Sequence, residues 1–437
     1  MPADTSNLGD AAFNRVRVLF ADQLNLARGK YVPLDFAKSG VVRLCVGAYA
    51  VTYQRDLIDA PGSGVSEGLP DLEAMFDPED LRPGWEPNTR IALASLESGG
   101  EPSGLCGRSA LKRAIAQWQE LGLNPKIGFE GEAYIFERDD KGAWVPYDAP
   151  GGFVYGTGPF TDPAGLIDDI WEMAFKCGLP VESFNAEYDA SQFELTLEYA
   201  DALKACDDIF LFRTMARELL YKRGYLLSFM PKPIADRGGS GLHMNLSFGD
   251  AAGKNAMDGG TQEGALSELV GGCIAGLLQH HEGLGGLVAP TVNSYDRLKP
   301  AQMCGYWANW GFDHRAVAVR ISGETGSASR IEHRVGDCAA SPYVAATGLL
   351  QAARLGYTKG YELPPPEKAD GFEVVSTTRG LAENLGASLD ALEQDTELVD
   401  AVGRLLVENY IAIKRAEINE VDGLSEAEVF DYYAPFI

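Results

Sequence analysis

The pattern of hydrophobic and polar positions predicts a buried strand with two carboxylates on one face at residues 126–137. In the stretch KIGFEGEAYIFE, apolar residues alternate from Ile127 to Ile135 along one face, as they do in a strand that packs on a core. The opposite face carries Glu130 and Glu132. Neighbouring carboxylates repel each other, and burial adds to that cost unless a cation or a shared proton compensates.

Three further segments alternate in the same way and also collect polar groups on one face. These groups are Glu194 in SQFELTLE, with Glu187 shortly before it, His243, Asn245 and Ser247 in GLHMNLSF, and Arg330, Glu332 and Arg334 in SRIEHRV. If the four strands share a sheet, their polar faces form one surface with five glutamates, a histidine and a ring of arginines.

Each of these signals also has a plainer interpretation. A single alternating strand fits a solvent-facing edge, a lone histidine fits a hydrogen-bonded core residue, and a Glu–Arg pair fits a cross-strand ion pair. The repetition over four separate segments favours a shared site. Carboxylates and an imidazole suit Mg²⁺ or Mn²⁺, and arginines suit carboxylates and phosphates. Together they predict phosphoryl transfer to a carboxylic acid.

Helical spacing predicts where the helices lie. The stretch SALKRAIAQWQELG, which starts at residue 109, is amphipathic, and further helices are expected over 163–177, 201–223 and 262–282, with a helical tail over 340–436. Residues 14–60 are strand-rich and are followed by Pro- and Gly-rich text. The sequence therefore predicts an α+β fold with a domain boundary near residue 104.

Composition narrows the class of protein. The chain has 437 residues and a net charge of −26, which argues against binding to nucleic acid or to anionic membranes. We expect no transmembrane helix, because no apolar run reaches the required length, and no secretion signal, because the start lacks a basic segment before an apolar one. Seven cysteines without a CxxC pair indicate reduced thiols in a cytoplasm.

An ordered set of motifs resembles the glutamine synthetase family. The set is CGRSALK, GFEGEAYIF, NAEYDASQFEL, KPIADRGGSGLHMNLSF, NSYDRLKP, DHRAVAVRI and SRIEHRVGDCAASPY. The resemblance covers roughly residues 15–360. It implies a small β-grasp-like domain at 1–104 and a catalytic domain at 105–437 with a curved antiparallel sheet flanked by helices. It also implies stacked rings, commonly a dodecamer, whose active sites are shared between neighbouring subunits.

The family's reaction implies roles for particular residues. ATP phosphorylates the γ-carboxylate of L-glutamate, and an amine then displaces the phosphate. One Mg²⁺ or Mn²⁺ would fall to Glu132, Glu187 and Glu194, and a second to Glu130, His243 and Glu332. Substrate contacts would come from Arg297, Arg334, Gly239, His243 and Tyr155. Nucleotide contacts would come from Glu182, Asn245, Ser247 and Arg330. Catalytic roles would fall to Arg315, Arg320, Glu187 and Asp56, the last from an adjacent subunit.

Three departures from the family's motifs bear on the amine. Asn245 replaces a histidine, Gly238 replaces an asparagine, and Met303 stands where a glutamate would accept a proton from ammonium. Methionine packs against alkyl groups, and the aromatic residues of the same segment could hold an alkylammonium by cation–π contact or could be plain core. These aromatics are Tyr306, Trp307, Trp310 and Phe312.

The leading hypothesis is therefore a glutamate ligase for a small organic amine, methylamine first. The alternatives are a glutamine synthetase that uses Asp56 or Asp59 of a neighbouring subunit, a ligase for polyamines, and a catalytically inactive relative with a structural role. The retained set of metal ligands and arginines argues against the last of these.

Overall fold

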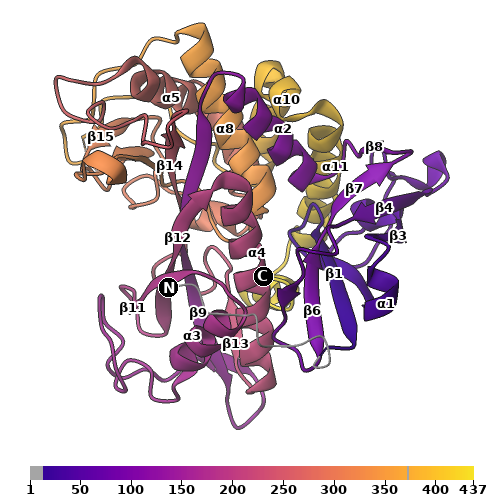
Figure 1. Cartoon of the computed structure of the whole chain (residues 1–437). Coiled ribbons are helices and arrows are strands. Elements are labelled where there is room, and N and C mark those ends of the chain that lie inside the picture. Colours follow the sequence, from indigo (N-terminus) through magenta and orange to yellow (C-terminus); the bar gives the residue numbers. More distant parts are fainter. Residues whose placement is uncertain (1–12, 372–373) are drawn as a thin grey trace.

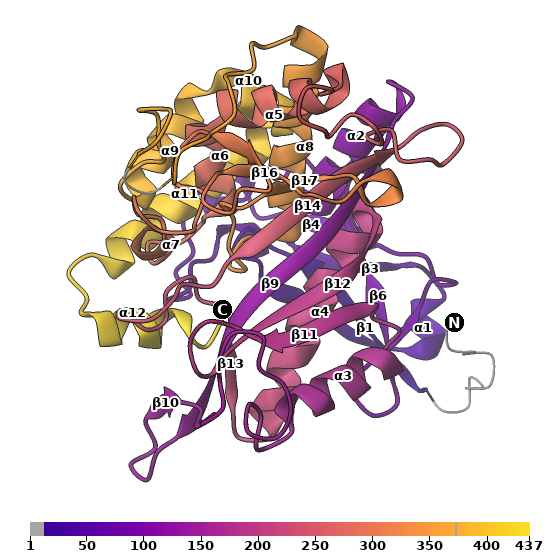
Figure 2. The same ribbon diagram turned by 90° about the vertical axis from the view of Figure 1, so that its left-hand side faces the viewer.

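The fold is built on one large mixed sheet. The computed structural model describes residues 13–371 and 374–437, and its sheet has nine strands in the order β11-β12-β9-β14-β17-β16-β15, with β10 and β13 also paired to β9. The four strands predicted from the sequence lie next to one another in it, as β12, β9, β14 and β17, which confirms that they share a sheet (Figure 2). The expected antiparallel pairing fails at one edge, where β15 and β16 are parallel.

The strands of this sheet have the following bounds: β9 (Asn124–Arg138), β10 (Trp144–Pro146), β11 (Val181–Ala186), β12 (Gln192–Asp201), β13 (Leu226–Ser228), β14 (Leu242–Gly249), β15 (Trp310–Phe312), β16 (Val319–Ile321) and β17 (Ile331–His333). Alternation sets their faces. Ile127, Phe129, Ala133 and Ile135 of β9 are all buried, so the apolar face of the strand packs on the core as predicted.

Helices pack on the apolar side of the sheet and on one another. They are α2 (Gly107–Gln119), α3 (Leu166–Lys176), α4 (Ala202–Lys222), α5 (Glu268–Gln279), α6 (His281–Val288), α7 (Ser294–Arg297), α8 (Pro342–Lys359), α9 (Leu385–Gln394), α10 (Thr396–Val402), α11 (Arg404–Val421) and α12 (Glu426–Tyr433). Trp118 of α2 is fully buried, packs against Phe248 of β14 with ring centroids 4.3 Å apart and ring planes tilted by 40°, and donates its Nε1 hydrogen to the Leu350 carbonyl of α8. Two helices and the sheet therefore meet at one side chain.

The predicted helices are present with two corrections, the first in the helical tail expected over 340–436, where the described residues have no helix between α8 and α9. Those expected over 163–177 and 201–223 are α3 and α4, but the one expected over 262–282 is split at His280 into α5 and α6. His280 is buried, and its Nδ1 lies 2.7 Å from an oxygen of Asp395, which precedes α10. No helix of the described residues is long and apolar enough to cross a membrane.

The N-terminal region forms two smaller sheets, β2-β1-β6-β5 and β3-β4-β7-β8. Their elements are β1 (Arg15–Ala21), β2 (Ala27–Pro33), α1 (Leu34–Ala37), β3 (Val41–Cys45), β4 (Asp71–Met75), β5 (Arg82–Pro83), β6 (Thr89–Leu93), β7 (Ser95–Ser98) and β8 (Glu101–Pro102), with short 3₁₀ turns at Val46–Ala50 and Val65–Glu67. A third 3₁₀ turn, Gly326–Ala328, lies just before β17 of the large sheet. β1 and β6 pair in parallel. Residues 1–12, on which the expectation of no secretion signal partly rests, lie outside the described residues.

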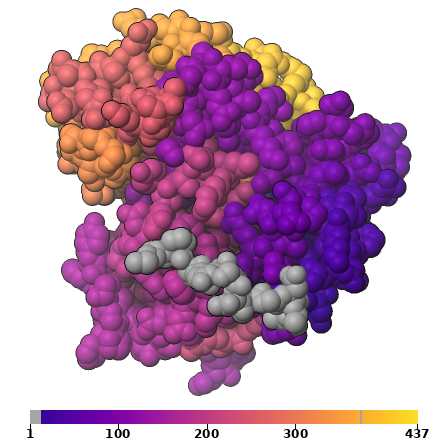
Figure 3. Space-filling model, viewed as in Figure 1, coloured from indigo at the N-terminus to yellow at the C-terminus, as the bar shows by residue number. Residues whose placement is uncertain are grey.

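Ion pairs fasten the N-terminal region to α4. Arg17 binds Glu218 with 2.7 Å between Nη2 and Oε1, and Arg82 of β5 binds Asp208 with 2.5 Å between Nη1 and Oδ1. In Figure 1 this region lies on the right, and α4 stands between it and β11 and β12 on the left; Figure 3 shows its indigo surface continuing into the purple surface beside it. The boundary near residue 104 remains a prediction.

Candidate active site

The register of the central strands brings the predicted carboxylates side by side. Glu194 of β12 lies opposite Glu132 of β9, and His243 of β14 lies opposite Glu130 of β9. Directly opposed residues in antiparallel strands have their Cβ atoms about 4.5–5.5 Å apart and on the same face. The alternation along each strand and the pairing between strands therefore build one polar surface.

Two groups of possible metal ligands result, and in each group the ligand atoms lie within 4.8 Å of one another. The groups are Glu132, Glu187 and Glu194, and Glu130, Glu194 and His243. The structure thus brings together the whole of the first predicted set. Of the second set, Glu130 and His243 converge on Glu194, which belongs to both groups. Oxygen atoms with one imidazole nitrogen are donors that suit Mg²⁺ or Mn²⁺.

The electrostatics of the cluster favour a bound cation. Burial, and then the charges of the surrounding glutamates, raise the pKa of Glu194 to about 8. Burial and the charge of Glu132 also raise the pKa of Glu187. Burial acts on Glu130 too, but contacts with His243 and Asn245 outweigh it and lower its pKa to about 2. Like charges held this close are costly unless a cation offsets them, so the donor set fits divalent metal.

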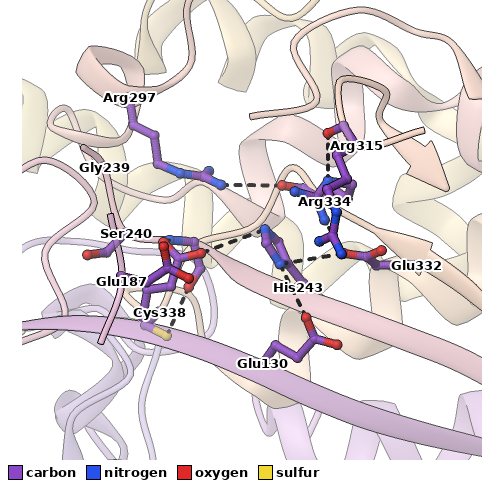
Figure 4. A network of polar contacts seen from close by, with 12 residues as sticks. Glu130, Glu187, Gly239, Ser240, His243, Arg297, Arg315, Glu332, Arg334 and Cys338 are labelled. Atoms are coloured by element: carbon purple, nitrogen blue, oxygen red, sulfur yellow. Dashed lines mark hydrogen bonds and ion pairs between the residues drawn. The ribbon is translucent and has the colours of Figure 1, made fainter. Parts of the chain in front are cut away.

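Glu332 of β17 links the acidic cluster to the arginines. It is almost fully buried, and its Oε1 lies 3.5 Å from Nδ1 of His243. Its other contacts are ion pairs with Arg334 and with Arg320, whose Nη1 donates to Oε2 at 2.9 Å. Figure 4 shows His243 between Glu130 and Glu332, with Arg334 directly above Glu332. Two guanidinium groups therefore neutralise Glu332.

Arg297 and Gly239 are brought together as the resemblance implies. Arg297 is buried, and its Nη1 donates to the Val335 carbonyl at 2.7 Å. A Cβ atom at Gly239 would lie 2.7 Å from Cγ of Arg297, and one at Gly241 would lie 2.7 Å from its Nη2. Only glycine leaves room for this guanidinium beside the loop.

Asn245 joins the metal side of the site to Arg330. Its Nδ2 donates to Oε1 of Glu130 at 2.8 Å, and its Oδ1 accepts from Nε of Arg330 at 3.0 Å. Arg315 is exposed, and its carbonyl accepts from Nε of Arg334 at 3.0 Å. The asparagine that replaces the family's histidine is thus a neutral bridge between an anion and a cation.

A cavity of about 360 Å³ lies at the C-terminal end of β14, the strand that carries His243, and is lined by Ser247. Tyr199 of β12 and Lys126 of β9 line it as well, and Tyr199 is 58% exposed. Sequence reasoning missed Tyr199, although it follows Glu198 directly on an alternating strand. Glu182, the other position expected at the nucleotide, is exposed on β11.

The residues expected at the amine differ in exposure and in their local contacts. Tyr155 is 70% exposed, and its backbone N–H donates to the Ala186 carbonyl next to Glu187. Met303 is 60% exposed, whereas Trp310 is buried and donates its Nε1 hydrogen to the Pro364 carbonyl, so Trp310 is plain core. Asp56 is exposed in the N-terminal region, which α4 separates from β11 and β12 in Figure 1.

A two-part carboxylate cluster, fixed arginines and a flanking cavity define an ATP-dependent ligase that activates a carboxylic acid. Residues 104–433 match the family model described as the catalytic domain of glutamine synthetase. The chain belongs to the glutamine synthetase family and is an ATP-dependent ligase of glutamate and an amine.

The similar proteins differ in the activity that their names state. Glutamine synthetase of Methanococcus maripaludis is 32% identical over 350 residues, which cover 76% of each chain. A glutamate–isopropylamine ligase of a Pseudomonas species is 27% identical over 82% of this chain and 80% of its own. The structure of GmaS, a γ-glutamylmethylamide synthetase, without ligand has a TM-score of 0.82 and 28% identity over 97% of this chain and 98% of its own.

Proposed function

We propose that the protein joins the γ-carboxylate of L-glutamate to a small organic amine, methylamine first, through γ-glutamyl phosphate. The observation that carries the proposal is the segment between Arg297 and Arg315. It has no carboxylate from Lys299 to Phe312, and the position expected to take a proton from ammonium is the exposed Met303. Similarity to GmaS over almost the whole chain supports the same choice.

We assign metal binding to the carboxylates and His243, and stabilisation of the transferred phosphoryl group to arginines. Glu132, Glu187 and Glu194 would hold one divalent cation, and Glu130, His243 and Glu332 a second. Such cations, when bound, neutralise phosphate oxygens during transfer. Fixed guanidiniums do the same without reorganising, and we assign this to Arg315 and Arg320.

We assign glutamate and ATP to different parts of the site. We assign the carboxylates of glutamate to Arg297 and Arg334, with Gly239 and His243 beside them. We assign ATP to the cavity at Ser247, with Arg330, Asn245 and Glu182 at its border. Tyr155, exposed beside Glu187, is assigned to the amine.

Assembly and location are also proposed. A carboxylate such as Asp56 can serve the site only from a neighbouring subunit, which favours a ring assembly such as a dodecamer. All seven cysteines are free, and six of them are buried, which fits a reducing cytoplasm.

The experiment that tests the amine is a panel of ammonium, methylamine, ethylamine, ethanolamine and putrescine, with phosphate release measured at saturating glutamate and Mg·ATP. We expect the highest kcat/KM with methylamine. A kcat/KM for ammonium that equals the best organic amine would overturn the proposal in favour of a glutamine synthetase. That second candidate is supported by the curated relatives that carry this name.

A further inference from the structure

The guanidinium of Arg320 is held between two carboxylates. Arg320 stands on β16 directly opposite Glu332 of β17, and its side chain is only 12% exposed. Its Nη1 donates to Oε2 of Glu332 at 2.9 Å. Its Nε donates to Oδ1 of Asp313 at 3.1 Å, and its Nη2 donates to the same oxygen. Asp313 and Glu332 together therefore determine how this guanidinium is turned.

These contacts leave part of the guanidinium available to a substrate. A guanidinium has five N–H hydrogens in a fixed planar fork, and three of them donate to Asp313 and Glu332. Within residues 13–371 and 374–437, the other two, one on each Nη atom, have no acceptor. Such paired N–H groups match the oxygens of a phosphoryl group. The orientation that Asp313 imposes therefore decides which donors of Arg320 remain free.

The backbone around Asp313 is fixed independently of its carboxylate. The N–H of Asp313 donates to the Ile321 carbonyl at 2.8 Å. Nε2 of His314 lies 2.8 Å from the Ala369 carbonyl, and the N–H of Ala316 donates to Nδ1 of His314 at 3.2 Å. Asp313 has a φ of 47°, in the left-handed region that Asp, Asn and Gly tolerate best. A suitable substitution at 313 should therefore leave the loop in place.

The fold itself has little need of the Asp313 carboxylate. The side chain is 65% exposed, and an exposed ion pair contributes little to stability. Asp313 also stands outside both groups of possible metal ligands. The hydrogen bond from Arg320 lowers the pKa of Asp313 below its ordinary value, so the carboxylate is charged at neutral pH. The main effect of the pair is therefore on the orientation of Arg320.

We infer that Asp313 is a positioning residue that holds Arg320 in the orientation needed to stabilise the transferred phosphoryl group. The inference rests on the role proposed for Arg320 and deepens it. A guanidinium stabilises developing charge best when it is already in place, because nothing then has to reorganise. The contact with Glu332 at Nη1 alone would leave the guanidinium free to turn. The contacts of Nε and Nη2 with Asp313 remove that freedom.

The test measures kcat and KM for phosphate release by the full chain with glutamate, Mg·ATP and the best amine of the panel. Asp313→Gly removes the carboxylate and suits the φ of this position. We expect kcat to fall roughly 10- to 100-fold, the scale of a misplaced catalytic group. The KM values for ATP and glutamate should change by less than about 3-fold, because the interaction is made in the transition state. Asp313→Asn keeps an acceptor of the same shape without the charge and should lose less.

A cycle of single and double variants separates positioning from a merely structural role. If Asp313 acts through Arg320, adding Asp313→Gly to Arg320→Ala should lower kcat by less than about 2-fold. Asp400→Asn is the matched control, because it removes a comparably exposed carboxylate that pairs with Arg404, and it should leave kcat unchanged. If Asp313→Gly does not fold, the same cycle is run with Asp313→Asn. An unchanged kcat, a rise in KM alone, or an equal loss in both backgrounds would overturn the inference.

Failure of the proposed function gives a different result. Full kcat in Arg320→Ala would refute the role proposed for Arg320, and the inference with it. A large loss in Arg320→Ala together with an unchanged kcat in Asp313→Gly would refute the inference alone. A preference for ammonium over every organic amine would change the proposed amine but would support the same role for Asp313 if the cycle behaves as expected, since phosphoryl transfer comes first with either substrate.

Discussion

The buried ion pair of Lys414 and Glu417 offers the sharpest test of how the core supports the site. Both side chains are about 1% exposed, and Nζ lies 2.7 Å from Oε2. The Tyr433 hydroxyl donates to Oε1 of Glu417 at 2.6 Å and accepts from the N–H of Val292 at 3.2 Å. Val292 stands just before α7, which ends at Arg297. The pair therefore fixes the approach to an arginine assigned to glutamate.

Replacing Lys414 by methionine should destabilise the protein strongly. It leaves a buried carboxylate with one hydroxyl as its partner, and breaking a buried pair in this way costs about 3–5 kcal/mol. The double variant Lys414→Met/Glu417→Leu removes both charges, and such replacements are often neutral or stabilising. We therefore expect the double variant to recover most of the loss in urea unfolding.

The pH dependence gives a second check on the single variant. Burial raises the pKa of Glu417 even with Lys414 present. A carboxyl group whose folded pKa exceeds its unfolded value contributes stability at low pH, and this is lost as pH rises through the folded pKa. The deficit of Lys414→Met should therefore be smaller at about pH 5 than at about pH 8. A loss under about 1 kcal/mol, or a double variant no better than the single one, would refute the reasoning.

Three further predictions follow from the site and the core. Glu132→Ala removes a carboxylate from the cluster and should lower kcat by roughly a thousand-fold or more while the fold persists by circular dichroism; full turnover would contradict the metal assignment. Tyr199→Ala removes a ring on which the adenine of ATP could stack, and should raise the KM for ATP roughly 5- to 100-fold with the KM for glutamate unchanged; equal rises in both KM values would contradict a nucleotide site beside Ser247. Burial lowers the pKa of His281, which contacts the Tyr306 carbonyl, so stability should fall as pH drops below about 6.5, and His281→Gln should flatten the melting temperature between about pH 7 and pH 5; an unchanged slope would exclude this histidine as the cause.

Much of the sheet could be predicted because a strand's period of two is visible within a few residues. The buried side of β9 and the polar side with Glu130 and Glu132 both came from alternation alone. Register could not be predicted, because it depends on which distant residues pair. For this reason the sequence did not indicate that Glu194, opposite Glu132, would belong to both groups of metal ligands.

The errors have the same long-range origin. The apolar pattern is continuous through His280, and the break there coincides with contact to Asp395, more than a hundred residues later. The parallel pairing of β15 and β16 has no local signal either. The role of an aromatic residue also depends on its surroundings: Trp310 is core, whereas Tyr199, on a strand that was correctly predicted, lines a cavity.

The salt links between α4 and the N-terminal sheets have a practical consequence for anyone who shortens this chain. Asp207 and Asp208 are buried, and their partners Arg82 and Arg108 lie on either side of residue 104. A fragment that starts at 105 would retain Arg108 but leave Asp208 with only the solvent-facing Lys204 as a cationic partner. A chimera that joins residues from 105 onward to the N-terminal region of a relative should therefore be stable only when that region has an arginine at the position of Arg82, which pairs with Asp208.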